Sequence, residues 1–408
     1  MQADHISRVV FEYAGRIGAA RDTHDFLKLN ADMARDLVGA DRCSVWLVDR
    51  KREQLWTTVA HGVDEIRIPM GTGIVGATVS GDETILVNDT ENDPRFMKNA
   101  AGGYQTKSLL SIPLRGSDGV VIGVLQALNK PDGFLPEDSE LLGLAAAYAA
   151  NSLEAQRNRE AAEGARLLQK EIDIASNVQR KLFPQVLPKV DGLDYAAFCR
   201  PAKGVGGDYY DFIAMPDGGM ILTLGDVSGK GIAAAVLMAS IQASIRAKVV
   251  EPPASLANLI DGFNKAIYSF STSDKYSTLF VAQVDSTGRK VRYVTAGQEP
   301  PVLLRANGSV ESLSIGGMPV GLVPFAKYEQ GEVELGVGDV ILICSDGVTE
   351  AMNPDEEMLD GEAVEQLVRD HAALSANEVT LKVIEAVDRF ANGAPQSDDI
   401  TITVLRAV

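Results

Sequence analysis

The stretch LGDVSGKG (Leu224–Gly231) ends an apolar run that predicts a buried strand over Gly219–Leu224. The strand delivers Asp226 to its end, where a carboxylate is held rigidly. The neighbouring glycines let backbone or ions approach closely, because glycine has no side chain. A long helix is expected next, over Gly231–Val249, but the G-x-x-x-x-G-K-[ST] spacing of a nucleotide-binding P-loop is absent. The stretch therefore predicts an acidic site at the edge of a sheet.

Three further segments of the second half place aspartate beside glycine or at a strand end. They are GGDYYD (206–211), SDGVTE (345–350) and SDDIT (397–401), and the second follows a buried strand predicted over Val340–Cys344. Each segment alone is more often a turn, but the four in this order are specific. Carboxylates without histidine or cysteine suit Mg²⁺ and Mn²⁺, which take oxygen ligands. Two such ions ~3.5–4 Å apart can clamp a phosphoryl group and supply a hydroxide nucleophile.

In this order the four segments resemble the PPM metal-dependent serine/threonine phosphatases, in their bacterial SpoIIE-like branch. The resemblance covers roughly Leu187–Val408, more than half of the chain. It implies an α+β fold in which a β-sandwich is flanked by helices, with two Mn²⁺ or Mg²⁺ ions at one edge. The preceding segment Glu171–Pro184 also resembles the linker found before this domain in such regulators.

The same resemblance implies a role for each matching residue, and makes the four aspartates both catalytic residues and metal ligands. Asp226 corresponds to the carboxylate that bridges both ions, and the backbone carbonyl of Val227 helps to bind them. Asp208 corresponds to a ligand of one ion, and Asp346 and Asp398 correspond to ligands of the other.

Three more acidic residues lie within the same motifs. Asp399 replaces Asp398 as the metal ligand if the register is off by one residue. Asp211 and Glu350 are weaker candidates, expected to surround the site or to lie at the surface.

Two positions depart from the family pattern. Eukaryotic relatives have a histidine soon after the bridging aspartate, where this chain has residues 227–229, Val-Ser-Gly, so the leaving group is expected to take its proton from water. Gln298 stands where the branch usually has histidine, and its role is left open.

The composition narrows the class of protein. Of 408 residues, 46% are hydrophobic and 23% charged, as in globular chains. Lys plus Arg total 38 and Asp plus Glu 56, and the net charge of −18 argues against nucleic-acid and membrane partners. Cys43, Cys199 and Cys344 form no C-x-x-C pair. No stretch approaches the ~20 apolar residues of a membrane span, and the start is unlike a signal peptide. We expect a cytoplasmic protein.

The first 155 residues mix helix and strand, with a helix predicted over His24–Leu37. Asp25–Arg157 resembles a GAF domain, through the order of elements and the motif SIPL (111–114) leading to GVL (123–125). Asn129-Lys130 with Phe134 and Asp138 is similar to a motif of cyclic-nucleotide-binding GAF domains, in which it is largely structural; Ser139 replaces its final glutamate. The resemblance implies either an unidentified small-molecule ligand or dimerisation alone.

Residues 156–186 predict a helical linker, because they contain no proline before Pro184 and one glycine. Apolar or small residues alternate at spacings of four and three, with Gln179 interrupting the pattern: Ala161, Ala165, Leu168, Ile172, Ala175 and Leu182. Such a heptad pattern predicts a coiled coil that joins two copies of the chain. The alternative is one amphipathic helix packed on its own chain.

We therefore predict three parts: a GAF-like sensor (1–155), the linker (156–186) and a phosphatase domain (187–408). The family resemblance implies a signal-regulated phosphoserine/phosphothreonine phosphatase acting on a phosphorylated anti-sigma-factor antagonist, a STAS-type protein. The competing hypothesis is a GAF sensor, for example of a cyclic nucleotide, joined to a pseudo-phosphatase that binds partners without catalysis.

Overall fold

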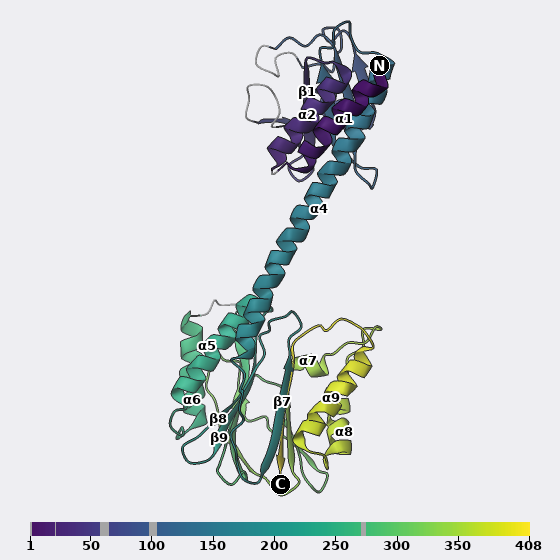
Figure 1. The fold of residues 1–408 in the computed structure, drawn as a ribbon. Helices are drawn as coiled ribbons and strands as arrows, with labels where there is room; N and C mark the ends of the chain where they lie inside the picture. The colour runs from purple at the N-terminus through teal and green to yellow at the C-terminus, as the bar shows by residue number, and fades with distance from the viewer. Residues whose placement is uncertain (1, 21, 58–64, 98–103, 271–274) are drawn as a thin grey trace. The chain divides into compact units, whose positions relative to one another are not determined.

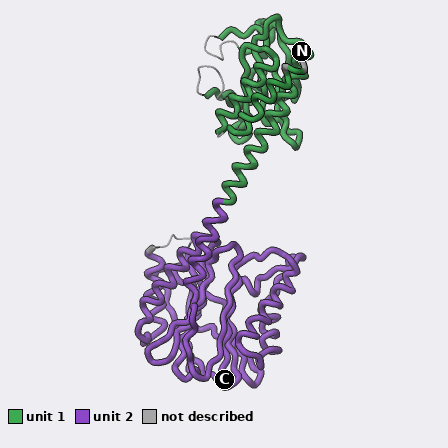
Figure 2. The backbone as a smooth tube through the Cα atoms, in the orientation of Figure 1, with its two compact units in different colours: residues 1–166 green, residues 167–408 purple. Residues whose placement is uncertain are grey.

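The computed structural model describes residues 2–20, 22–57, 65–97, 104–270 and 275–408. The chain forms two compact units, Met1–Arg166 and Leu167–Val408 (Figures 1 and 2). Helix α4, Pro136–Arg180, is continuous from the first unit into the second. The predicted boundaries, after residues 155 and 186, fall on either side of this division. None of the described helices is long and apolar enough to cross a membrane.

Unit 1 is built on a six-stranded antiparallel sheet with the order β3-β2-β1-β6-β5-β4. Its strands are β1 (Arg42–Asp49), β2 (Gln54–Thr57), β3 (Ile66–Pro69), β4 (Ile85–Val87), β5 (Leu109–Arg115) and β6 (Val121–Leu128). Side chains alternate along a strand. Val45 and Leu47 thus join a core with α1 (Gln2–Gly18), α2 (Thr23–Val38) and α4, whereas Trp46 packs on the other face with α3 (Gly73–Gly81).

The helices of unit 1 follow from local signals. The helix predicted over His24–Leu37 is α2, and its first turn is capped by Asp22, whose carboxylate accepts a hydrogen bond from the amide of Asp25 at 2.8 Å. Helix α1 was not predicted, although Val9, Tyr13 and Ile17 recur every four residues and are all buried. This spacing of four residues is the sequence signal from which α1 could have been predicted.

The Asn-Lys-Phe-Asp motif is used to hold unit 1 together. The side-chain oxygen of Asn129 accepts a hydrogen bond from the amide of Lys107 at 2.7 Å. The ammonium of Lys130 pairs with the buried Asp138 carboxylate at 2.5 Å, and Asp138 also accepts from the amide of Leu135, just before α4. Phe134 is fully buried. Each motif residue therefore has an internal structural role.

Unit 2 is a sandwich of two sheets with the orders β14-β11-β10-β9-β8 and β13-β12-β16-β17-β7, and β15 pairs with β11. The first sheet consists of β8 (Tyr209–Ala214), β9 (Met220–Val227), β10 (Ser277–Val284), β11 (Lys290–Ala296), β14 (Gly316–Gly317) and β15 (Gly331–Glu334). The second consists of β7 (Leu193–Arg200), β12 (Val302–Leu304), β13 (Val310–Ser312), β16 (Val340–Cys344) and β17 (Ile400–Ala407).

Helices cover both outer faces of the sandwich (Figure 1). They are α5 (Ile232–Lys248) and α6 (Leu256–Phe270) on the first sheet, α8 (Gly361–His371) and α9 (Ala376–Ala391) on the second, and the short α7 (Asp346–Thr349) after β16. Strand β16 is buried on both faces: Ile341 and Ile343 face the other sheet, and Val340 and Leu342 face α8 and α9. Its unbroken apolar run is the signature of such a strand. The predicted helix-flanked β-sandwich is confirmed.

The last turns of α4 pack on unit 2, which covers part of the predicted coiled-coil seam. Gln179 is buried, Ile172, Ala175 and Leu182 are partly buried, and Leu182 contacts the core beneath α5 and α6. These four side chains contact their own chain, whereas the other predicted seam residues, Ala161, Ala165 and Leu168, are exposed, and for them the coiled coil stays a prediction.

Candidate metal centre

The first sheet contributes two aspartates to one edge of the sandwich. Asp226 lies near the end of β9, and Asp208 lies in the loop directly before β8. The two segments are in close contact: a Cβ added to Gly207 would lie 2.6 Å from the carbonyl oxygen of Val227 and 3.1 Å from Oδ1 of Asp226. Only glycine allows this approach, so the sequence GGD brings Asp208 to Asp226.

The second sheet contributes two more aspartates from neighbouring segments. Asp346 begins α7 directly after β16, and Asp398 lies just before β17. Ser345 joins the segments, because its hydroxyl donates to the carbonyl of Asp399 at 3.1 Å and accepts from the amide of Thr401 at 2.9 Å. The pairing of β16 with β17 thus sets Asp346 beside Asp398.

The four carboxylates act on one another electrostatically. Burial raises the pKa of Asp208 well above its usual range, and the Asp226 charge adds to the effect. Burial, together with the charges of Asp346 and Asp398, raises the pKa of Asp226 to about 7. Burial and Asp398 also raise the pKa of Asp346. Because the ionised carboxylates destabilise one another, a positive charge bound among them would stabilise their ionised forms.

One lysine supplies part of that charge. Lys230, from the glycine-rich turn after β9, places its ammonium 2.9 Å from Oδ2 of Asp398 and 2.5 Å from the carbonyl oxygen of Ser397. The Asp398 carboxylate in turn raises the pKa of Lys230. Lys230 therefore connects the turn after β9 to the residues just before β17.

The chemical type of the predicted ligand atoms fits a hard divalent cation. Oδ2 of Asp208 is buried and has no hydrogen-bond partner within the described residues, so a carboxylate oxygen is available for an ion. Every predicted donor is a carboxylate or carbonyl oxygen, which is the set that Mg²⁺ and Mn²⁺ prefer. In the described parts of the chain, no three acidic, histidine or cysteine side chains lie close enough together to hold a metal ion.

The remaining acidic candidates have other contacts. Asp399 accepts hydrogen bonds from the amides of Ala202 at 2.8 Å and Gly207 at 2.7 Å, so its carboxylate organises the loop that carries Asp208. Asp211 is fully buried in a two-bond ion pair with Arg246 of α5, at 2.6 and 2.7 Å. Glu350 is exposed after α7. These positions give Asp399 and Asp211 supporting roles in the fold of the site.

Gln298 joins the two sheets at this edge, a role that no sequence pattern indicated. Its side-chain oxygen accepts from the Thr278 hydroxyl at 2.7 Å, and its amide nitrogen donates to the carbonyl of Cys344 at 2.8 Å. The Thr278 hydroxyl also accepts from the amide of Asp226 at 3.3 Å. Gln298 thus links the backbone at Asp226 to the end of β16, two residues before Asp346.

Gln298→Leu should lower the free energy of unfolding by about 1–3 kcal/mol, because it leaves a buried carbonyl without a donor. It should also reduce phosphate release by loosening the Asp226 backbone. The matched control is Gln283→Leu at the far end of β10, where the partner is the partly exposed guanidinium of Arg292. Urea unfolding of both variants measures the difference. Equal losses of stability and activity in the two variants would contradict this role.

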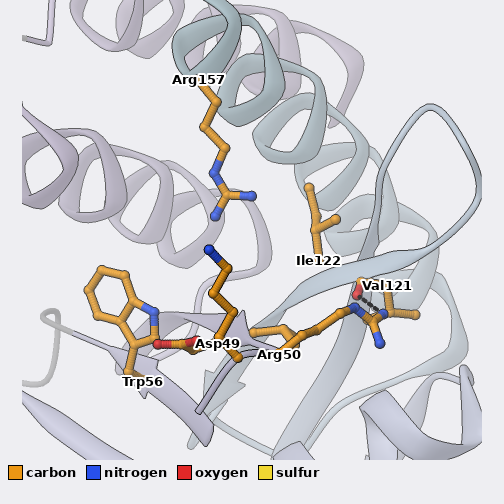
Figure 3. Close-up of a pocket in the computed structure, with 8 residues that line it drawn as sticks. Asp49, Arg50, Trp56, Val121, Ile122 and Arg157 are labelled. Atoms are coloured by element: carbon orange, nitrogen blue, oxygen red, sulfur yellow. Dashed lines mark hydrogen bonds between the residues drawn. The ribbon is translucent and has the colours of Figure 1, made fainter. Parts of the chain in front are cut away.

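Unit 1 has a pocket of about 420 Å³ between the turn that joins β1 to β2, the start of β6 and α4 (Figure 3). Its polar lining is mainly cationic, with Arg50, Lys51 and Arg157 against one carboxylate, Asp49; its apolar lining includes Trp56. Arg50 donates to the carbonyl of Val121 at 3.2 Å. This lining suits an anionic small molecule with a flat apolar part.

Two family models match parts of the chain, one in each unit. Residues 216–408 match the family model of stage II sporulation protein E (SpoIIE), and residues 22–153 match that of the GAF domain. The chain is 29% identical over 243 residues to the phosphoserine phosphatase RsbU of Bacillus subtilis, which covers 59% of this chain and 70% of that protein.

Two further proteins resemble single units. The dual 3′,5′-cyclic-AMP and -GMP phosphodiesterase 11A of Takifugu rubripes is 33% identical over 151 residues, covering 29% of this chain and 17% of that protein. Among solved structures, the SiaA-PP2C domain of Pseudomonas aeruginosa matches with a TM-score of 0.52 at 22% identity, over 60% of this chain and 98% of that one. The last match concerns the fold alone.

Proposed function

We propose that the chain is a signal-regulated serine/threonine protein phosphatase of the SpoIIE-like PPM type, joined to a GAF domain and dependent on two Mn²⁺ or Mg²⁺ ions. The matches to the SpoIIE and GAF family models and to the phosphoserine phosphatase RsbU support this proposal. The observation that carries the proposal is the set of four aspartates, two from each sheet, at one edge of the sandwich. Asp208, Asp226, Asp346 and Asp398, with the carbonyl of Val227, would hold the ions. In this proposal Asp399 positions the loop that carries Asp208, through the amides of Ala202 and Gly207, instead of binding an ion.

The residues of the site prepare it for a phosphoryl group. Bound divalent ions supply positive charge for phosphoryl oxygens and make water a better nucleophile at neutral pH. The chain keeps Asp208 buried and aimed, holds Asp226 at a strand end, and offsets the charge of Asp398 with Lys230. The three cysteines take no part, because burial raises the pKa of each thiol above its usual range.

The substrate class we propose is phosphoserine or phosphothreonine on a STAS-type anti-sigma-factor antagonist, the partner implied by the SpoIIE-like resemblance. The test is phosphate release from such a phosphoprotein and from an aryl phosphate, with and without Mn²⁺. The full chain is compared with residues 167–408, because the structural unit begins at Leu167. Turnover that requires Mn²⁺ and differs between the two chains supports regulated catalysis. Absence of turnover on both substrates favours the pseudo-phosphatase hypothesis.

We propose that the full chain is a homodimer through α4, but on a different face from the predicted seam. Leu167, Ile174 and Val178 are more than half exposed on α4, and their spacing of seven and four residues places them on one stripe. This stripe is apolar and lies on a part of the helix whose other face, at Ile172 and Gln179, packs on unit 2. A second copy of the chain is the occupant that would bury it.

Ile174→Asp combined with Val178→Asp should convert the dimer to a monomer, because two charges would be buried in the helix contact. Sedimentation velocity measures the change. The control is Asn177→Asp, which adds a charge to an exposed position in the same turns. A sedimentation coefficient unaffected by the double substitution would refute dimerisation through this stripe.

We assign no ligand to the GAF domain; its cationic pocket is the place that suits an anionic one.

A further inference from the structure

The pocket of unit 1 lies on the face of the sheet that α1, α2 and α4 cover. Trp56, which lines it, stands opposite Leu47 across the β1–β2 pair, and Leu47 belongs to the core beneath those helices. Ile122 packs on the same core, and Arg157 comes from α4 itself. Helix α3 lies on the other face, where it packs with Trp46. The pocket therefore lies between the sheet and α4, away from α3.

The lining of this pocket locally reverses the charge of the chain. Two cations from the turn that joins β1 to β2 and one from α4 face a single carboxylate, that of Asp49, in a protein whose net charge is −18. This carboxylate is itself offset from outside the lining, because guanidinium nitrogens of Arg67 and Arg52 lie 3.8 and 3.9 Å from its Oδ2. A local excess of positive charge attracts anions into a cavity, so we expect a negatively charged ligand.

Two of the three cations have their hydrogen-bond donors available. Arg50 is held by the carbonyl oxygen of Val121, to which it donates at 3.2 Å. The side chains of Lys51 and Arg157 have no ion-pair or hydrogen-bond partner among the residues that the structure describes. A guanidinium binds phosphate oxygens through two parallel hydrogen bonds, and an ammonium adds a point charge. Two such cations match the dianion of a phosphate monoester, whose second pKa is about 6.

The apolar part of the pocket is built around an indole ring. Trp56 is partly buried, and the guanidinium of Arg67 lies 5.4 Å from its ring centroid. In Figure 3 Arg157 points from α4 toward the β1–β2 turn, and Trp56 lies on the side of the sheet. Aromatic rings pack favourably on one another when they are offset or edge-on. The volume of about 420 Å³ is typical of small-molecule pockets, and it leaves room for a ring beside a phosphate group.

We propose that this pocket is a binding site for a phosphate monoester that carries a planar aromatic ring, such as a nucleoside monophosphate. Arg157 and Lys51 would hold the phosphate group, and Trp56 would pack on the ring. The site goes beyond the proposed function, which assigns no ligand to this unit, and it uses no residue of the acidic edge of unit 2. Its ligand would join two elements of unit 1, α4 and the β1–β2 turn.

The test is isothermal titration of the full chain, with a chelator present so that no metal-bound phosphate in unit 2 contributes. Three probes are compared: adenosine 5′-monophosphate, inorganic phosphate, which lacks the ring, and adenosine 3′,5′-cyclic monophosphate, which carries a single negative charge. The first should bind roughly 10-fold more tightly than either of the others, because each of these loses the ring contact or one charge. Equal affinity for either of them overturns the proposal, as does the absence of binding at millimolar adenosine 5′-monophosphate.

Arg157→Gln should weaken the binding of adenosine 5′-monophosphate roughly 10–100-fold, because it removes a charged contact made through two hydrogen bonds. Arg157 is exposed, so the fold should persist. The matched control is Arg159→Gln, an exposed arginine two residues further along α4, whose guanidinium donates to the carbonyl of Ala155. Equal affinities in the two variants overturn the site, whatever phosphatase activity the chain shows.

A second pair of variants separates the two parts of the ligand. Trp56→Leu should weaken the binding of adenosine 5′-monophosphate and leave that of inorganic phosphate unchanged. Lys51→Gln, at an exposed turn position where folding is not at risk, should weaken the binding of both. A folded Trp56→Leu variant that binds the nucleotide as tightly as the unaltered chain contradicts the ring contact, and unaltered binding by Lys51→Gln contradicts the phosphate contact.

Discussion

Asp226→Asn should abolish Mn²⁺-dependent phosphate release, with kcat/KM lower by roughly three orders of magnitude, which corresponds to about 4 kcal/mol of transition-state stabilisation. Asp226 is the carboxylate whose pKa responds to the charges of Asp346, Asp398 and Asp399 together, so it lies at the centre of the acidic cluster. Asparagine has the same shape but no charge to offer a divalent ion. The amide of residue 226 still donates to Thr278, so the fold should persist.

The control for this experiment is Asp217→Asn. Asp217 lies in the turn between β8 and β9, at the far end of β9, where it accepts a hydrogen bond from the amide of Gly219. Phosphate release is measured for both variants at saturating Mn²⁺, with circular dichroism to verify folding. If folded Asp226→Asn keeps more than a small fraction of the activity, the acidic cluster is not the catalytic centre.

The metal-free protein should lose stability as the pH rises from 5 to 8. Burial raises the pKa of Asp208 well above its usual range, and burial with neighbouring charges raises that of Asp226 to about 7. The folded state then holds protons that the unfolded state has already released, so the free energy of unfolding falls with rising pH. The contribution of these protonated carboxyl groups to the free energy of unfolding is fully present below a pH of about 4, and it is lost as the pH rises through about 7.

Asp208→Asn should reduce this pH dependence and raise the stability of the chelator-treated protein at pH 8, because it replaces a buried titratable carboxyl group, whose Oδ2 has no hydrogen-bond partner among the described residues, by a neutral amide. Unfolding in urea with a chelator, across pH 5 to 8, measures both effects. With saturating Mn²⁺ the trend should reverse, since metal ions bind deprotonated carboxylates. Two results would count against a desolvated acidic site. One is a free energy of unfolding of the metal-free protein that rises with pH. The other is a pH dependence of Asp208→Asn that equals that of the control variant Asp217→Asn.

Several buried strands and the order of the acidic residues along the chain could be predicted from the sequence alone. The run Val340–Cys344 is apolar at every position, which identifies a strand buried on both faces whatever its neighbours are. The motif around Asp226 likewise contains its own strand end and glycine turn. Both features are local, because the pattern of burial along a strand is written in consecutive residues. The family resemblance then added roles for the aspartates.

Only the tertiary structure decided what Gln179 and Gln298 do. Gln179 donates to the carbonyl of Gly206, 27 residues away, and Gln298 to that of Cys344, 46 residues away, so neither contact leaves a local pattern. The same holds for the helix α4: its periodicity predicted an apolar face at Ile172, but whether that face meets a second chain or its own depends on how the chain folds back. A side-chain amide finds its partner through the packing of a helix and two sheets, and that packing is the product of the whole fold.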